Sequence, residues 1–547
     1  MNSLKPMLLT SLKSYDRTQF VKDVTAGIIV AIIALPLSIA LALASGVGPE
    51  AGIFTAIVAG FVISALGGSS VQIAGPTAAF ATIVAGIVAK DGLDGLVIST
   101  ILAGIFLILM GLCHFGSLIK FIPYTITTGF TSGIAVTIVI GQLKDFFGVT
   151  YPDGVKPIET TEKFKAFIEN ISTMNTAALI VGIVSLAILI ISPVIFKKIP
   201  GSLIAVIVGI LMVKFLPLKV STIGNLYTIS NSLPAFHLPA VNLHIIENAL
   251  PNAFTIAVLA AIESLLSCVV ADGMINGKHR SDMELVAQGA GNIASALFGG
   301  IPATGAIART AANIKNGGRT PVAGMGHSIT LGIVLVVLMP FAGMIPMPTI
   351  AAILFIVAYN MCQWRTFVHL IRTAPKSDII VLFATFILTI LFDLVVAIEI
   401  GMVLACLLFI KRMSEETHID GWTYVDDDTP DVDAHLKKLP LQIRVYEITG
   451  PLFFGAADAI EHIVVKDFTT CLVLRMRSVP AIDSTAMNAL FNLTKVCENK
   501  GITLVFSHVN EQPMKVMEKA GFVELVGREN FCPNISAALA HAEEISI

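Results

Sequence analysis

The sequence predicts an all-α polytopic membrane protein with fourteen transmembrane segments, followed by a small α/β domain in the cytoplasm. Of the 547 residues, 55% are hydrophobic and 13% are charged, whereas soluble domains carry about a quarter charged residues. Apolar runs separated by short polar loops fill residues 24–412, and the composition then becomes that of a soluble protein. Most of the chain is therefore expected to lie in lipid.

Hydrophobic run length defines the expected spans, because a helix that crosses a bilayer needs about 20 apolar residues. Ten runs come close to this length: 24–46, 51–67, 93–115, 123–142, 176–195, 201–217, 252–271, 322–345, 377–394 and 395–411. Four others are short or interrupted by Gly and Pro: 70–89, 284–299, 302–315 and 348–361. An even number of spans returns the chain to the side of the membrane on which it begins.

Basic residues orient these spans, because cytoplasmic loops carry an excess of Lys and Arg. If residues 1–23 are cytoplasmic, the loops that hold Lys278, Arg280, Lys315 and Arg319 are cytoplasmic as well. We therefore expect both termini in the cytoplasm.

Two of the interrupted segments resemble each other: "QIAGPTAAFATIVAGI" (72–87) and "GGIPATGAIARTAANI" (299–314). They are the third and tenth of fourteen spans, so each is third in a half of seven spans. Since seven is odd, the halves have opposite orientation, which predicts a 7+7 inverted repeat. Short segments broken by Gly and Pro at matching positions indicate the binding site of a transporter. The alternative is that Gly and Pro only kink closely packed helices.

A helix that begins in mid-membrane carries unpaired N–H groups and a partial positive charge at its first turn. Two such N-termini that face each other suit an anion, and Arg309, expected about two turns into the second half helix, adds positive charge. Backbone N–H groups, small side chains and the Thr77 hydroxyl are the expected contacts. The predicted substrate-binding residues are Thr77, Ala78, Ala79, Phe80, Ala306, Ile307, Ala308 and Arg309.

Glu263 lies in the middle of the segment 252–271. A carboxylate in a low-dielectric environment can carry a proton, and ionisable groups inside a membrane usually have a function. We expect Glu263 to couple transport to an ion, with the proton favoured over sodium. The alternative is a static partner for Arg309 or for backbone amides.

Several long motifs, in order along the whole chain, resemble the SulP anion permeases, which are solute carrier family 26 in animals. The motifs are "GPTAAFATI" (75–83), "GFTSGIAVTIVIGQLKDFFG" (129–148), "IESLLSCVVADGM" (262–274) and "GGIPATGAIARTAANIKNGGRTPVAG" (299–324). The resemblance implies a core domain (spans 1–4 and 8–11) that moves against a gate domain (spans 5–7 and 12–14), in an elevator-like cycle. It also implies an anion site between spans 3 and 10, and a homodimer.

Within this family the sequence is most similar to the bacterial branch that contains a C4-dicarboxylate permease, which shares "PATGAIART". A similar cyanobacterial bicarbonate permease holds sodium on spans 8 and 10. The corresponding positions here are Glu263, Ser267, Gly305, Ala306 and Ile307. Ile307 lacks a hydroxyl ligand, so the comparison favours proton coupling through Glu263 and Ser267. Leu37 stands where many relatives have Gln or Glu, which removes a polar group from span 1.

Residues 413–439 are charged and are expected to form a linker. Residues 440–547 alternate short β-branched runs with amphipathic stretches, which predicts a small sheet with helices on one face. With its motif "VPAIDSTAMNAL" (479–490), this region resembles the STAS domain and bacterial anti-sigma-factor antagonists. We expect Asp483 to cap the helix that begins at Ser484 and Thr485. The alternative, implied by the resemblance, is a phosphorylated serine at this motif.

The sequence carries no nucleophile–base pair, no metal-type cysteine spacing and no ATPase motif. We therefore expect no enzyme, no metal, no cofactor and no nucleic-acid partner. The expected function is secondary active transport of sulfate, bicarbonate or a C4-dicarboxylate across the bacterial cytoplasmic membrane. Two alternatives remain: an anion channel of the same fold, and a membrane-anchored sensor whose STAS domain binds a cytoplasmic protein.

Overall fold

The computed structural model describes residues 4–117, 123–152, 154–155, 157–195, 200–216, 218–239, 243–392, 394–422, 442–461, 463 and 468–546. The chain forms two compact units, Met1–Met402 and Val403–Ile547, and each is described by itself.

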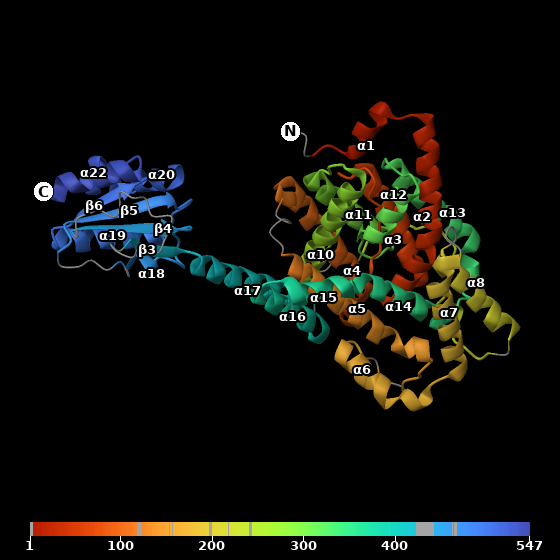
Figure 1. Ribbon diagram of the computed structural model, residues 1–547. Helices are drawn as coiled ribbons and strands as arrows, with labels where there is room; N and C mark the ends of the chain where they lie inside the picture. Colours follow the sequence, from red (N-terminus) through yellow and green to blue (C-terminus); the bar gives the residue numbers. More distant parts are fainter. Residues whose placement is uncertain are drawn as a thin grey trace. The chain divides into compact units, whose positions relative to one another are not determined.

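The first unit is helical, and its first half supplies the first seven expected spans (Figure 1). These spans lie in α2 (Arg17–Ala44), α3 (Pro49–Leu66), α4 (Ala78–Leu112), α5 (Tyr124–Phe147), α7 (Thr176–Ile195) and α8 (Gly201–Phe215). Gly92, with a φ of 72°, interrupts α4 and separates the third span from the fourth. Short elements join the spans: α1 (Met7–Ser11), η1 (Leu12–Ser14), β1 (Ala74–Gly75), α6 (Thr160–Glu169), η3 (Ile171–Thr173) and α9 (Ile223–Leu226).

The second half supplies the other seven spans. They are α10 (Leu243–Ile275), α11 (Ser281–Leu297), α12 (Ile307–Lys315), α13 (Val322–Ala342), α14 (Met347–Cys362), α16 (Lys376–Leu391) and α17 (Leu394–Glu415). The strand β2 (Thr304–Gly305) precedes α12, and the amphipathic helix α15 (Trp364–Thr373) follows α14. Each of the fourteen expected spans thus corresponds to a helix, and the predicted fold class is confirmed.

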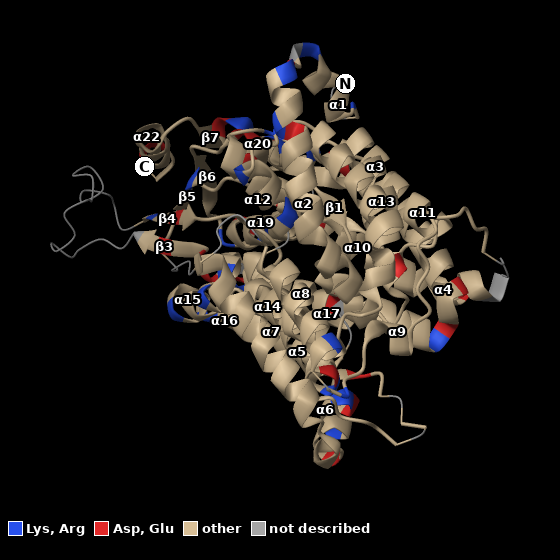
Figure 2. Ribbon diagram, turned by 90° about the vertical axis from the view of Figure 1, so that its right-hand side faces the viewer, with Lys and Arg blue, Asp and Glu red and all other residues tan. Residues whose placement is uncertain are grey.

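Eight helices in the described part of the chain are long and apolar enough to cross a bilayer. The remaining expected spans correspond to α8, α11, α12, α16 and α17, of which α12 is a half helix that begins at the second break. Figure 2 shows the long helices almost free of Lys, Arg, Asp and Glu along their lengths.

Small residues let these helices approach closely. Gly104 of α4 and Gly289 of α11 face each other, and a Cβ on either one would overlap the carbonyl oxygen of the other. Helix contacts in membranes depend on such small residues, because lipid gives no hydrophobic drive for helices to associate.

The N-terminal segment is more ordered than the sequence suggests. The first span was expected from residue 24, but α2 begins at Arg17, where the Asp16 carboxylate accepts a hydrogen bond of 2.7 Å from the Gln19 N–H. Asp23 is fully buried and accepts hydrogen bonds from the Gln19 amide and the Thr320 hydroxyl. These contacts join the start of the first span to the loop that follows α12.

The second unit is a five-stranded sheet with the order β3-β4-β5-β6-β7. The strands are β3 (His418–Trp422), β4 (Ile443–Thr449), β5 (Cys471–Ser478), β6 (Thr503–Ser507) and β7 (Phe531–Cys532). The edge strand β3 is antiparallel to β4, and the other pairs are parallel. The helices are α18 (Asp458–Glu461), α19 (Ser484–Asn499), α20 (Glu511–Lys519), α21 (Phe522–Val526), η5 (Arg528–Asn530) and α22 (Ile535–Ser546).

Helices cover both faces of this sheet, and the expectation that they cover one face is wrong. Leu472 and Leu474 of β5 pack in the same core as α19, α20 and α21. Val473 points to the opposite face, where it packs with Ala538 and Leu539 of α22. Successive strand residues point to opposite faces, so the near-continuous apolar run of β5 requires cover on both.

Part of the expected linker is structured. Residues 413–415 end α17, and residues 418–422 form β3. The remainder of the expected linker, 423–439, lies outside the described residues.

Candidate functional site

The two broken segments cross each other. β1 and β2 pair antiparallel, with Ala74 opposite Gly305 and Gly75 opposite Thr304. The Ala306 N–H extends this pairing with a hydrogen bond of 2.9 Å to the Ile73 carbonyl oxygen. Because the strands are antiparallel and a helix follows each of them, α4 and α12 begin on opposite sides of one crossing. Their N-termini are thus brought together from regions more than two hundred residues apart in the sequence.

Neither helix start has a side-chain cap among the described residues. Thr77 and Ala306 are the N-cap residues of α4 and α12, and neither position shows a side-chain hydrogen bond to the first turn. The first N–H groups of a helix lack partners within the helix and attract negative charge. Inside a membrane such groups need a ligand or a polar cavity.

Arg309 lies at this crossing. It is 2% exposed, and its Nη2 donates to the Pro76 carbonyl at 3.2 Å and to the Ser38 hydroxyl at 3.3 Å. Its Nε and Nη1 find no partner in the described part of the chain. Arg309 is the third residue of α12, in the first turn, so the expected position about two turns into the helix is wrong. The guanidinium therefore reaches back to the broken third span instead of pointing along its own helix.

Gly75 makes room for this guanidinium. A Cβ at Gly75 would overlap the Nη1 of Arg309. The glycine of "AGPT" thus lets the cation lie against the main chain of the third span.

Residues of α10 form hydrogen bonds to both broken segments. The Thr77 hydroxyl donates to Oε2 of Glu263 at 2.9 Å, and the Thr304 hydroxyl donates to the Ala260 carbonyl at 3.0 Å. One turn beyond Glu263, the Ser267 hydroxyl is buried without a partner among the described residues. The expected ion-coupling residues, Glu263 and Ser267, therefore lie on α10, the helix that contacts both broken segments.

The other expected contacts differ in exposure. Ile307 is 42% exposed and Ala308 is also exposed, so the start of α12 is open. Ala79 and Phe80 are fully buried, and we interpret the Phe80 side chain as packing. Ala78 and Ala306 contribute only small side chains beside their backbone groups.

Sequence reasoning missed Ser38 and Thr310. Ser38 follows Leu37 on the first span and gives Arg309 its hydroxyl contact. The Thr310 hydroxyl accepts a hydrogen bond of 3.0 Å from the Ile73 N–H. Each directly follows a residue that the motifs single out, Leu37 and Arg309, but an uncharged hydroxyl in an apolar run gives no signal of its own.

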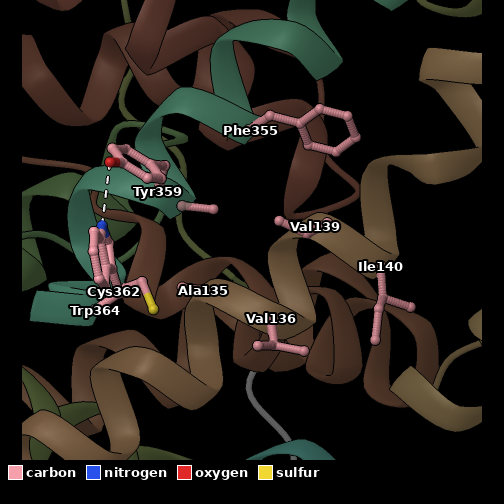
Figure 3. Close-up of a pocket in the computed structure, with 9 residues that line it drawn as sticks. Ala135, Val136, Val139, Ile140, Phe355, Tyr359, Cys362 and Trp364 are labelled. Atoms are coloured by element: carbon pink, nitrogen blue, oxygen red, sulfur yellow. Dashed lines mark hydrogen bonds between the residues drawn. The ribbon is translucent and has the colours of Figure 1, made fainter. Parts of the chain in front are cut away.

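A pocket lies among α5, α14 and the start of α15 and has a volume of about 610 Å³ (Figure 3). It is lined by Ala135, Val136, Val139, Ile140, Phe355, Ala358, Tyr359, Cys362 and Trp364. Trp364 Nε1 donates to the Tyr359 hydroxyl at 3.2 Å, so the indole N–H has a hydrogen-bond acceptor within the pocket lining. The lining carries no charge, and we do not assign an anion to it.

In the second unit, Asp483 caps α19. Its Oδ1 accepts from the Ala486 N–H at 2.9 Å, and its Oδ2 accepts from the Phe454 N–H at 2.8 Å. Ser484 and Thr485 are exposed in the first turn of the helix. Among the described residues, no cluster of His, Cys, Asp and Glu could hold a metal ion.

Two protein families match the chain. The sulfate permease family matches residues 20–385, and the STAS domain matches residues 437–538.

Relatives match over nearly the whole length. YvdB of Bacillus subtilis, whose name assigns it provisionally to sulfate transport, is 39% identical over 530 residues, which cover 95% of this chain and 97% of that protein. The bicarbonate transporter BicA of Picosynechococcus is 31% identical over 538 residues, covering 95% and 94%.

Solved structures show the same fold. The murine solute carrier 26 family member A9, an anion transporter solved in an inward-facing state, superposes with a TM-score of 0.86 at 19% identity, covering 99% of this chain and 94% of that one. The transmembrane domain of a cyanobacterial BicA gives a TM-score of 0.62 at 29% identity, covering 72% and 98%.

Proposed function

Because the chain belongs to the sulfate permease family and is an integral membrane protein with a STAS domain, we propose that it is a proton-coupled secondary transporter of small anions. The anion is held between the half helices α4 and α12. Elevator-type alternating access then moves it across the cytoplasmic membrane of a bacterium, with both termini in the cytoplasm.

The antiparallel crossing of β1 and β2 is the observation that carries this proposal. It joins two uncapped helix N-termini and one buried cation at a single point. A sensor that signals through its STAS domain needs no such arrangement in the membrane.

The charges at the crossing account for anion binding. Arg309 has no carboxylate partner within salt-bridge distance in the described part of the chain, and two of its nitrogens remain free. A buried cation without a partner is costly, and an anion offsets that cost while it accepts hydrogen bonds from the guanidinium and the helix starts. The small side chains of Ala306 and Ala308 let the anion approach the main chain.

Glu263 supplies the coupling. Its carboxylate, bonded to the N-cap residue Thr77, is an acceptor when ionised and a donor when protonated. Two negative charges in one low-dielectric site disfavour each other, so anion entry favours uptake of a proton by Glu263. Ser267 offers a second hydroxyl on the same face. Ile307 gives no hydroxyl for sodium, which supports the proton as the coupling ion.

Sulfate and bicarbonate are the first substrates to test, because the relatives' names specify them. A C4-dicarboxylate is the third, on the resemblance of "PATGAIART" to that branch of the family. All three are small anions that accept several hydrogen bonds.

The domain division follows the repeat. We assign spans 1–4 and 8–11 to a mobile core, spans 5–7 and 12–14 to a gate, residues 24–412 to the membrane domain, and 440–547 to the STAS domain. A homodimer is proposed on the resemblance to the family. Asp483 acts as a helix cap, and Ser484 and Thr485 remain accessible to a cytoplasmic partner.

Uptake into proteoliposomes tests this function. Purified full-length protein is reconstituted, and labelled sulfate, bicarbonate and fumarate are offered with an imposed proton gradient, an imposed sodium gradient, or none. We expect saturable accumulation of at least one anion, driven by protons and not by sodium. Acceleration of labelled uptake by unlabelled anion on the other side identifies a carrier.

Other outcomes point to the rival functions. A current that does not saturate and shows no counterflow identifies an anion channel. Absence of any anion movement, with intact binding of a cytoplasmic protein to the STAS domain, identifies a sensor. Accumulation driven by sodium contradicts the role of Glu263 as a proton carrier.

A further inference from the structure

Glu284 of α11 is a second carboxylate inside the membrane unit, and its side chain is fully buried. It accepts five hydrogen bonds from three parts of the chain. On Oε2 these come from the N–H groups of Gly68 (2.9 Å) and Ser69 (3.2 Å), and on Oε1 from Gln72 Nε2 (2.7 Å), Ser264 Oγ (3.2 Å) and Gln288 Nε2 (2.9 Å).

In this arrangement all five partners donate, which suits an ionised carboxylate. A protonated carboxyl needs an acceptor for its hydrogen, but main-chain N–H and side-chain NH₂ groups only donate. The Ser264 hydroxyl is already an acceptor for Gln72 Nε2 at 2.7 Å, and its own hydrogen points to Glu284. Glu284 thus accepts five hydrogen bonds, whereas Glu263 accepts one, from the Thr77 hydroxyl, among the described residues.

Gln72 connects this charge to the crossing. It stands two residues before β1, and its Oε1 accepts a hydrogen bond of 2.9 Å from Cys268 Sγ. Its amide packs on Gly305 of β2, where a Cβ would overlap it. Glu284 thus holds the amide that lies directly against the second strand.

We propose that Glu284 is a positioning residue that fixes, through Gln72, the crossing of β1 and β2 and with it the separation of the two helix starts. It does not touch the anion. The part of this proposal that concerns anion affinity rests on the proposed function, and the part that concerns Gln72 does not.

Transport kinetics test the link to affinity. In Glu284→Gln an NH₂ group replaces one acceptor oxygen among five donors, so the set of hydrogen bonds that holds Gln72 is weakened, although Gln72 keeps its bond to Ser264. We expect the KM for labelled sulfate to rise about tenfold with little change in maximal rate, as for lost binding. The milder Gln72→Met keeps the volume but loses the amide, and should raise KM similarly. The KM of the double variant should equal that of either single variant, because both substitutions break the same connection between Glu284 and Gln72.

Asp282→Asn is the matched control. Asp282 lies in the same first turn of α11, but it bonds to His114 and the Gly116 N–H, away from Gln72. Its KM should match the wild type. A purely structural role for Glu284 would lower the melting temperature and maximal rate of Glu284→Gln but leave KM unchanged, and that result would overturn the proposal.

Alkylation of Cys268 gives a readout that needs no transport. Cys268 is fully buried, and its thiol donates a hydrogen bond to Gln72. N-ethylmaleimide should therefore leave Cys268 unmodified in the wild type. It should label Cys268 in Glu284→Gln and Gln72→Met, where the packing around Gln72 is loosened. Cys471, fully buried in the second unit, should stay unlabelled and shows that each variant is folded there. If wild type takes up none of the three anions, the proposed function fails, whereas protection of Cys268 in both variants rejects the role of Glu284.

Discussion

At the scale of single residues, we expect that no other cationic side chain can replace Arg309 in anion binding. Lysine keeps the charge but presents one nitrogen, so it cannot bond to Pro76 and Ser38 and still offer free donors to an anion. We expect Arg309→Lys to raise the KM for the transported anion by about tenfold or more. Arg365→Lys, at an exposed position on α15, is the control and should leave KM unchanged. Equal KM values for Arg309→Lys and the wild type would remove Arg309 from the site.

Glu263 allows a test of coupling at the same scale. A glutamine at this position can still accept the hydrogen bond from the Thr77 hydroxyl, but it cannot take up a proton. We expect Glu263→Gln to lose the dependence of uptake on an imposed proton gradient while it keeps exchange of labelled for unlabelled anion. Uptake is measured in proteoliposomes at several external pH values. If uptake by Glu263→Gln depends on pH as uptake by the wild type does, the coupled proton is carried by a group other than Glu263.

The sequence identified Arg309, Glu263 and Thr77 because a charge, or a Gly-Pro-Thr break, is conspicuous in an apolar run. It could not identify Ser38 or Gln72, whose partners lie 271 and 192 residues away. Such contacts leave no local pattern. Glu284 was hidden for another reason: it begins a weak apolar segment, where a carboxylate is normally solvated.

At the scale of elements, two glycines form a matched pair, one just before the half helix α4 and one within it. A Cβ at Gly75, just before α4, would overlap the Arg309 guanidinium, whereas a Cβ at Gly86 meets nothing within 4 Å. We expect Gly75→Ala to displace the guanidinium and raise KM by about tenfold, and Gly86→Ala to leave transport as it is. Comparison of the two variants in one uptake assay checks this. Wild-type kinetics in Gly75→Ala would show that the crossing adjusts freely.

Hydropathy predicted the spans because lipid imposes length and composition on a helix. It placed the breaks as well, since Gly and Pro interrupt the pattern. The pairing of β1 with β2 was beyond it, because strands of two residues have no periodicity. The cover of the second sheet face by α22 was missed for a related reason: a continuous apolar strand does not show how its two faces are shared.

At the scale of the whole molecule, the two units bury different sets of titratable groups. The membrane unit buries carboxylates and a guanidinium with donors and acceptors around them. The second unit buries thiols, with Cys471 and Cys497 at 0% and 1% exposure. Burial raises the pKa of Cys471 to about 12 and that of Cys497 to about 11, from 9.0 in both cases. The second unit therefore responds to alkali through Cys471 and Cys497, whereas the membrane unit buries one thiol, Cys268, among its charged groups.

This difference predicts alkaline unfolding of the second unit. A raised pKa in the folded state stabilises folding fully below the unfolded value, near pH 9, and the stabilisation is lost as pH rises toward 11 and 12. Full-length protein in detergent is equilibrated in urea at about pH 8 or about pH 10.5. A brief N-ethylmaleimide pulse and mass spectrometry of the Cys471 peptide then report unfolding. We expect a lower urea midpoint at the higher pH, and a smaller pH effect in Cys497→Ala, which keeps Cys471 as the reporter but lacks one of the two titrating thiols. An equal fall in midpoint with and without Cys497 would assign the alkaline sensitivity to other groups.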